Sequence, residues 1–212
     1  MAVETQKGAM VATNTAAAAM SVASMVVGQY YMNQINSQLS EISNDVAKIA
    51  EFQNNEYCSN VMSLVNRVKV IADYQAEILE NNELRLLKIS QLDVLSDECT
   101  KLLGQANKTL ADCTMKMDLD FASYENSLTE AHAWYVYQKL LLDVLNKISE
   151  LRYTLHLGAV SRNHCDALLQ AYTQQSDEMQ DRLTKWHQST AERLKIDLSE
   201  IRRKRGGFDG AI

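Results

Sequence analysis

The sequence MNQINSQLSEISNDVAKI, residues 32–49, is the most regular stretch of the chain. Its apolar residues recur at alternating intervals of three and four, the spacing of one helix face. They are Met32, Ile35, Leu39, Ile42, Val46 and Ile49. The same spacing extends backwards through Val11, Asn14, Ala18, Ser21, Met25 and Gly28. One heptad phase therefore spans residues 11–49, and we call this row of positions the seam.

The composition favours long helices with few connections. The 212 residues include no proline and seven glycines, whereas average usage would supply roughly ten and fifteen. Sandwiches, barrels and wound α/β folds need many turns, so this composition argues against them. The sequence predicts an all-α fold, an elongated antiparallel helical bundle or coiled coil. We expect three long helices, which could be broken into four or five.

The predicted divisions rest on a few helix-ending signals. Asn81-Asn82 favours a reversal, Gly158 a left-handed helix end, and Ser161 an N-cap. We expect one elongated unit with an uncharged helix at 8–31, a heptad helix at 32–80, a second helical arm at 83–157, a third helix at 161–205 and a tail at 206–212. Interruptions at Gly104 or Asp118–Asp120 stay open. An unbroken arm of about 75 residues would be about 110 Å long.

The N-terminal segment is unusual because it carries no formal charge from Gly8 to Ser40. Seven of its first 21 residues are alanine, and leucine and isoleucine are absent from them. Three interpretations remain open: an Ala-rich helix packed closely in a soluble bundle or oligomer, a membrane-inserting or pore-lining helix, and a segment that is disordered or ordered only by a partner. The seam likewise suits either an intermolecular zipper or packing within the chain's own bundle.

Charge is distributed unevenly along the rest of the chain. Residues 41–100 carry eleven acids against five bases, which would suit a protein partner. The basic run Arg202, Arg203, Lys204 and Arg205 complements the negative end of a helix, or contacts an anionic lipid or phosphate surface. A net charge of −6 disfavours nucleic acid as a partner.

Searches for catalytic and cofactor motifs are negative. Phosphate-binding, dinucleotide-binding, zinc-protease and nucleophile-elbow patterns are all missing. The histidines show no Asp/Glu-x-x-His spacing for a metal pair. We therefore expect no catalytic residue, no metal site and no cofactor. The four cysteines are widely spaced, which is typical of reduced thiols, and the first residues make a poor signal peptide. These features predict a cytoplasmic protein, with membrane association left open.

The sequence thus predicts a non-enzymatic structural or assembly protein. We expect a homo-oligomer that self-associates through the N-terminal segment, and membrane lipid as a further partner of that segment. The architecture is similar to that of helical pore-forming and membrane-remodelling proteins, a likeness of shape alone. The alternative is a soluble coiled-coil adaptor or scaffold that binds a partner protein through the acidic middle segment.

Overall fold

The computed structural model describes residues 52–196, together with the single residue Ser37. The described chain forms five helices and no strand. They are α2 (Phe52–Asp73), α3 (Gln75–Glu80), α4 (Asn82–Thr114), α5 (Phe121–Leu155) and α6 (Arg162–Arg193). The predicted all-α bundle is confirmed for these residues.

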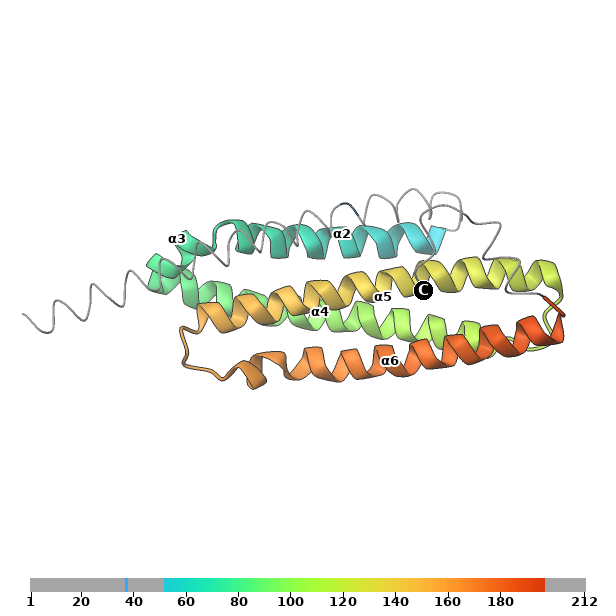
Figure 1. Ribbon diagram of the computed structural model, residues 1–212. Helices are drawn as coiled ribbons and strands as arrows, with labels where there is room; N and C mark the ends of the chain where they lie inside the picture. Colours follow the sequence, from blue (N-terminus) through green and yellow to red (C-terminus); the bar gives the residue numbers. More distant parts are fainter. Residues whose placement is uncertain (1–36, 38–51, 197–212) are drawn as a thin grey trace, which may run out of the picture.

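The four long helices run antiparallel to their chain neighbours and form an elongated bundle (Figure 1). α4 and α5 make the central pair, and α2 and α6 pack against that pair on opposite sides. The short helix α3 joins α2 to α4 at one end of the bundle. The loop between α4 and α5 and the end of α6 lie together at the other end. At about 1.5 Å per residue, the 35 residues of α5 span about 52 Å.

The hydrophobic core follows α5, which has buried side chains along its whole length. On the α2 side, Tyr57 packs edge-on against Trp134 and Tyr137, with ring centroids 4.7 and 5.0 Å apart. The Tyr57 hydroxyl donates a hydrogen bond to the Leu102 carbonyl oxygen of α4 at 2.9 Å. Aromatic edge-to-face contacts of this kind add to apolar burial. This cluster therefore ties α2 to both helices of the central pair.

Three predicted helix-end signals are confirmed. The Asn81 side chain accepts a hydrogen bond from the Leu84 backbone N–H and caps α4. Gly158 has a φ of 82°, the left-handed conformation that glycine adopts without steric cost. The Ser161 hydroxyl oxygen accepts from the His164 backbone N–H and caps α6. These three signals thus mark helix ends, although at the end of α5 the left-handed conformation already begins at Leu157, with a φ of 52°.

The predicted arm at 83–157 is divided, which corrects its expected length of about 110 Å. Residues 115–120 reverse the chain between α4 and α5, so that the two halves of the arm pack against each other. Asp118 adopts a φ of 56° in this loop, and Asp120 caps α5 by accepting from the Ser123 N–H at 2.8 Å. Gly104, the other candidate break, lies inside α4. Aspartate tolerates the left-handed conformation better than most residues, which explains a turn without glycine.

Candidate interaction surfaces

The α6 helix joins the bundle through polar as well as apolar contacts. Six of its 32 residues are buried, compared with fifteen of 35 in α5. Three of those six are Ser176, Thr190 and Trp186, whose side chains carry hydrogen-bonding groups. Hydrogen bonds link α6 to the central pair at three levels, which are described in turn below.

A polar layer crosses the middle of the bundle. Gln138 of α5 has no exposed surface, although its side chain is a polar amide. Its Nε2 donates to the Asn107 Oδ1 of α4 at 2.5 Å, and its Oε1 accepts from the Ser176 hydroxyl of α6 at 3.0 Å. The Asn107 Nδ2 donates in turn to the Gln175 Oε1 at 3.3 Å. A buried amide is tolerated when both of its ends are paired, as here.

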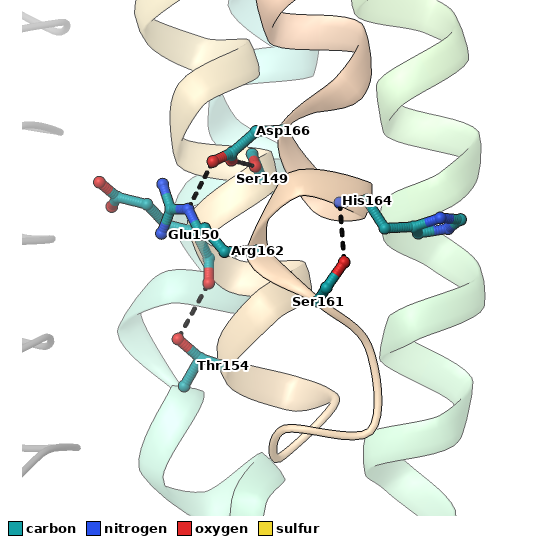
Figure 2. A network of polar contacts seen from close by, with 7 residues as sticks. All are labelled: Ser149, Glu150, Thr154, Ser161, Arg162, His164 and Asp166. Atoms are coloured by element: carbon teal, nitrogen blue, oxygen red, sulfur yellow. Dashed lines mark hydrogen bonds and ion pairs between the residues drawn. The ribbon is translucent and has the colours of Figure 1, made fainter.

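A second network joins α5 and α6 close to their connection (Figure 2). The Ser149 hydroxyl donates to one oxygen of Asp166, and the Arg162 Nε donates to the other at 2.7 Å. Burial alone would raise the pKa of the Asp166 carboxyl, but the hydrogen bonds from Ser149 and Arg162 and the Arg162 charge outweigh it. The pKa of Asp166 is therefore lowered. The carboxylate stays ionised and fixes the start of α6.

This network resembles part of a catalytic triad but lacks its base. A serine nucleophile needs a neighbouring imidazole that accepts its proton. In Figure 2 the side chain of His164 points away from Ser149 and Asp166. The Ser149 hydroxyl already donates its hydrogen bond to the Asp166 carboxylate. The arrangement therefore joins two helices and offers no activated nucleophile.

The third level anchors the α4–α5 loop on the end of α6. The Trp186 Nε1 donates to the Lys116 carbonyl oxygen at 3.3 Å, and Arg193 donates to the Leu119 carbonyl oxygen at 2.5 Å. Tyr124 Oη lies 2.5 Å from the Nδ1 of His187. Burial lowers the pKa of His187 below its usual value near 6.5. The neutral ring can then accept a hydrogen bond from the Tyr124 hydroxyl.

The buried imidazole predicts a stability that falls in acid. Below a pH of about 6.5 the unfolded chain takes up a proton at His187 that the folded chain resists. The contribution of neutral His187 to the free energy of unfolding is fully present above that pH, and it decreases as the pH falls below it towards the lowered pKa of the folded chain. His187→Gln should weaken this dependence in urea titrations at several pH values. His164→Gln, which changes an exposed ring, should keep the wild-type dependence. Equal pH profiles for wild type and His187→Gln would contradict the assignment.

The thiols of the buried cysteines are poorly suited to nucleophilic chemistry. All four are unpaired, and Cys99, Cys113 and Cys165 are buried. Burial raises the pKa of the Cys113 thiol to about 11, with the Glu130 charge adding to it. Burial likewise raises the pKa of Cys165. Among residues 52–196, no three His, Cys, Asp or Glu side chains are grouped to hold a metal ion.

Each end of the bundle exposes large apolar side chains. At the α4–α5 end they are Met115, Met117 and Phe121, which we call the loop surface. At the α3 end they include Leu86, Leu87 and Leu157, which we call the far-end surface. Exposed apolar groups that cluster on one region are typical of interaction sites. The sequence analysis did not predict either surface, because the exposure of these side chains depends on where the chain reverses.

The far end is also acidic. Asp73, Glu77, Glu80 and Glu83 follow one another around α3 within eleven residues. Glu77, Glu80 and Glu83 are exposed, and Asp73 is half-buried. These acids belong to the segment 41–98 that the adaptor hypothesis assigns to a protein partner. The structure gathers them beside the far-end surface.

The outer side of α2 carries a shallow depression of about 540 Å³. Its described lining residues all belong to α2 and include Cys58, Met62, Ser63, Asn66 and Arg67. Met62, Ser63 and Asn66 face outwards from the bundle, whereas Arg67 reaches α4 and pairs with Glu98 at 2.6 Å. Met62 is exposed there.

The predicted interaction residues lie outside the described chain. The seam runs from Val11 to Ile49 and the basic run from Arg202 to Arg205, whereas the structure describes 52–196 and Ser37. Both assignments therefore stay predictions. Within the described residues, no helix is long and apolar enough to cross a membrane.

Comparisons with known proteins identify no relative. No protein-family description, curated protein or solved structure matches this chain.

Proposed function

We propose that this protein is a non-enzymatic assembly protein. It self-associates through the seam at residues 11–49, and its uncharged N-terminal segment binds or enters a membrane, as in pore-forming or membrane-remodelling proteins. The seam residues are the apolar and small side chains that recur in one heptad phase. Such a row is stable only when another helix or a lipid phase covers it.

The observation that supports this proposal is a change of phase between the seam and α2. Counted onward in sevens from Val46 and Ile49, the seam positions reach Ser63, Val70 and Tyr74, which are all exposed. The core-facing residues of α2 occupy other positions of the heptad. They are Val61, Leu64, Val68 and Ile71. The α2 positions that continue the seam's phase therefore do not contribute to the described core, which other heptad positions of α2 complete.

Burial of apolar surface supplies the driving force for association. Each Å² of apolar surface removed from water contributes roughly 25 cal/mol. The larger seam residues from Met32 to Ile49 would provide most of that burial, because the earlier positions hold small side chains. Small residues allow helices to approach closely, including within a bilayer. Residues 32–49 would thus supply most of the burial, whereas the small residues at 11–28 would allow the close helix approach that association also needs, in water or within a bilayer.

Deleting residues 1–31 should abolish oligomerisation or binding to liposomes. Sedimentation velocity measures the first, and flotation with liposomes measures the second. The thermal unfolding transition of α2–α6 should survive the deletion, which separates lost association from lost folding. Unchanged sedimentation and unchanged flotation together would overturn the proposal.

A pair of point variants tests the seam itself. Ile35→Asn with Ile42→Asn places polar amides on two seam positions and should shift the protein towards the monomer. Gln34→Asn with Ser40→Asn introduces the same two asparagines off the seam without removing an apolar side chain, and it should leave the sedimentation coefficient unchanged. Equal sedimentation of the two variants would mean that the seam does not carry association.

The adaptor hypothesis is the second candidate, and the acidic far end favours it. Clustered carboxylates beside exposed leucines suit a basic partner with an apolar anchor. This hypothesis predicts that the full chain is monodisperse and does not bind lipid. The same sedimentation and flotation experiments therefore distinguish it from the assembly proposal.

A further inference from the structure

The hydroxyl group of Tyr137 is buried without a hydrogen-bond partner in the described part of the chain. Only 2% of Tyr137 is exposed, and its Oη makes no hydrogen bond. Its neighbour Gln138 is also buried, but that side chain is paired at both ends. An unpaired polar group in a core costs free energy, so it calls for a specific explanation, of which a redox role is one.

The thiol of Cys58 on α2 lies beside this hydroxyl. Tyr57, the preceding residue, packs edge-on against the Tyr137 ring, with the ring centroids 5.0 Å apart. The first turns of α2 therefore lie directly on Tyr137. Burial raises the pKa of Tyr137, and the neighbouring Cys58 thiol adds to that effect. The sulfur is thus close enough to interact with the Tyr137 oxygen.

Cys58 is also the described cysteine that solvent reaches most easily. It is half-buried, whereas the other three are buried. Its side chain packs against the edge of the hydrophobic core and lines the depression on α2. That depression has a volume of about 540 Å³, which is ample for a small oxidant. Cys58 therefore lies between an opening to solvent and a buried hydroxyl that has a hydrogen bond to donate.

We propose that Cys58 is a site of reversible oxidation by a hydroperoxide, with the Tyr137 hydroxyl as the donor that stabilises the oxidised sulfur. A sulfenic acid carries an oxygen on its sulfur, and oxygen is a much better acceptor than the sulfur of a thiol. The modification thus creates the acceptor that Tyr137 lacks in the reduced protein. The resulting hydrogen bond joins α2 to α5. This inference does not depend on the proposed self-association.

The oxidation step balances with the hydroperoxide as the only co-reactant. The Cys58 thiolate attacks the terminal peroxide oxygen, so that an S–O bond forms while the O–O bond breaks. The departing hydroxide or alkoxide takes up the proton that the thiol released. Sulfur loses two electrons, and the peroxide is reduced to water or an alcohol. Two molecules of a small thiol reverse the change, because they return Cys58 to the thiol and leave as a disulfide and water.

Trapping of the sulfenic acid tests the site. The full-length protein is treated with hydrogen peroxide in the presence of a 1,3-diketone, which labels sulfenic acids, and the labelled cysteines are identified by mass spectrometry of peptides. We expect Cys58 to be labelled about tenfold faster than any of the other three cysteines. Labelling of all four at similar rates, or no label at Cys58, would overturn the proposal.

Tyr137→Phe tests the role of the hydroxyl. The change removes one oxygen that has no partner, so the reduced variant should unfold at the same urea concentration as wild type or at a higher one. Its label at Cys58 should nevertheless fall about fivefold, because the hydrogen bond to the oxidised sulfur is lost. Tyr135→Phe is the matched control, since Tyr135 is a half-buried tyrosine of the same helix whose ring faces Lys139. It should be labelled as wild type.

Alkylation by iodoacetamide separates this role from simple access to the thiol. The reaction uses the same Cys58 sulfur but leaves no oxygen on it. Tyr137→Phe should therefore slow alkylation much less than it slows oxidation. Equal slowing of both reactions would mean that the substitution only changes access, and this would overturn the role assigned to Tyr137. Wild-type labelling of Tyr137→Phe by the diketone would overturn it as well.

Discussion

Replacing Leu141 with alanine is expected to lower the free energy of unfolding by about 2–5 kcal/mol. None of the Leu141 side chain is exposed, and it lies on α5, which contacts α2, α4 and α6. Its carbonyl oxygen also accepts a hydrogen bond from the Cys99 thiol of α4 at 3.3 Å. A cavity at this position cannot close by the movement of a single helix. The lost burial and the residual cavity therefore both contribute to the destabilisation.

Urea unfolding monitored by circular dichroism measures this change. Leu87→Ala is the matched control, because the same side chain is truncated on α4 where it is exposed. The control should change the free energy of unfolding by no more than about 0.5 kcal/mol. Similar losses for the two variants would show that Leu141 does not lie in a closed core.

Replacing Gln138 with leucine is expected to cost about 1–3 kcal/mol of the free energy of unfolding. The change removes the donor to Asn107 and the acceptor for the Ser176 hydroxyl. Ser176 is buried, so water does not readily replace the missing partner. Leucine has nearly the volume of glutamine, and the loss therefore reflects the unpaired groups more than a cavity.

A second substitution separates these causes. Adding Ser176→Ala to Gln138→Leu removes the hydroxyl that is left without a partner. The double variant should therefore recover part of the lost free energy of unfolding. Gln175→Leu, at an exposed position of the same layer, should have little effect. Amide hydrogen exchange of α6 should accelerate in Gln138→Leu more than exchange of α4. Unchanged exchange in α6 would mean that the polar layer does not hold this helix.

Much of the fold could be predicted from local signals. Asn81, Gly158 and Ser161 each mark a helix end by a side-chain or backbone property that acts within a few residues. The reversal at 115–120 could only be named as one of two candidate breaks. It contains no glycine or proline, and the left-handed residue is Asp118. The apolar periodicity also continues before and after this reversal, because α4 and α5 each bury one helix face in the same core.

The candidate surfaces were harder to predict. In the sequence, Met117 and Phe121 look like any other apolar residues of a helix. Their exposure depends on where the chain reverses. Nothing in the sequence indicates that Gln138 is buried, because a polar residue in a helix is usually exposed to solvent. Its partners Asn107 and Ser176 come from other helices. The seam and the basic run lie outside the described residues, so their assigned roles remain predictions.

The polar contacts of α6 also specify its alignment along the bundle. An apolar stripe tolerates a slip of one heptad, because equivalent side chains replace one another. If α6 moved by seven residues, the position opposite Gln138 would hold Leu169 or Leu183 in place of Ser176. The bonds from Ser149 to Asp166 and from Tyr124 to His187 would break at the same time. The energetic cost of the polar layer therefore gives this long helix a single register.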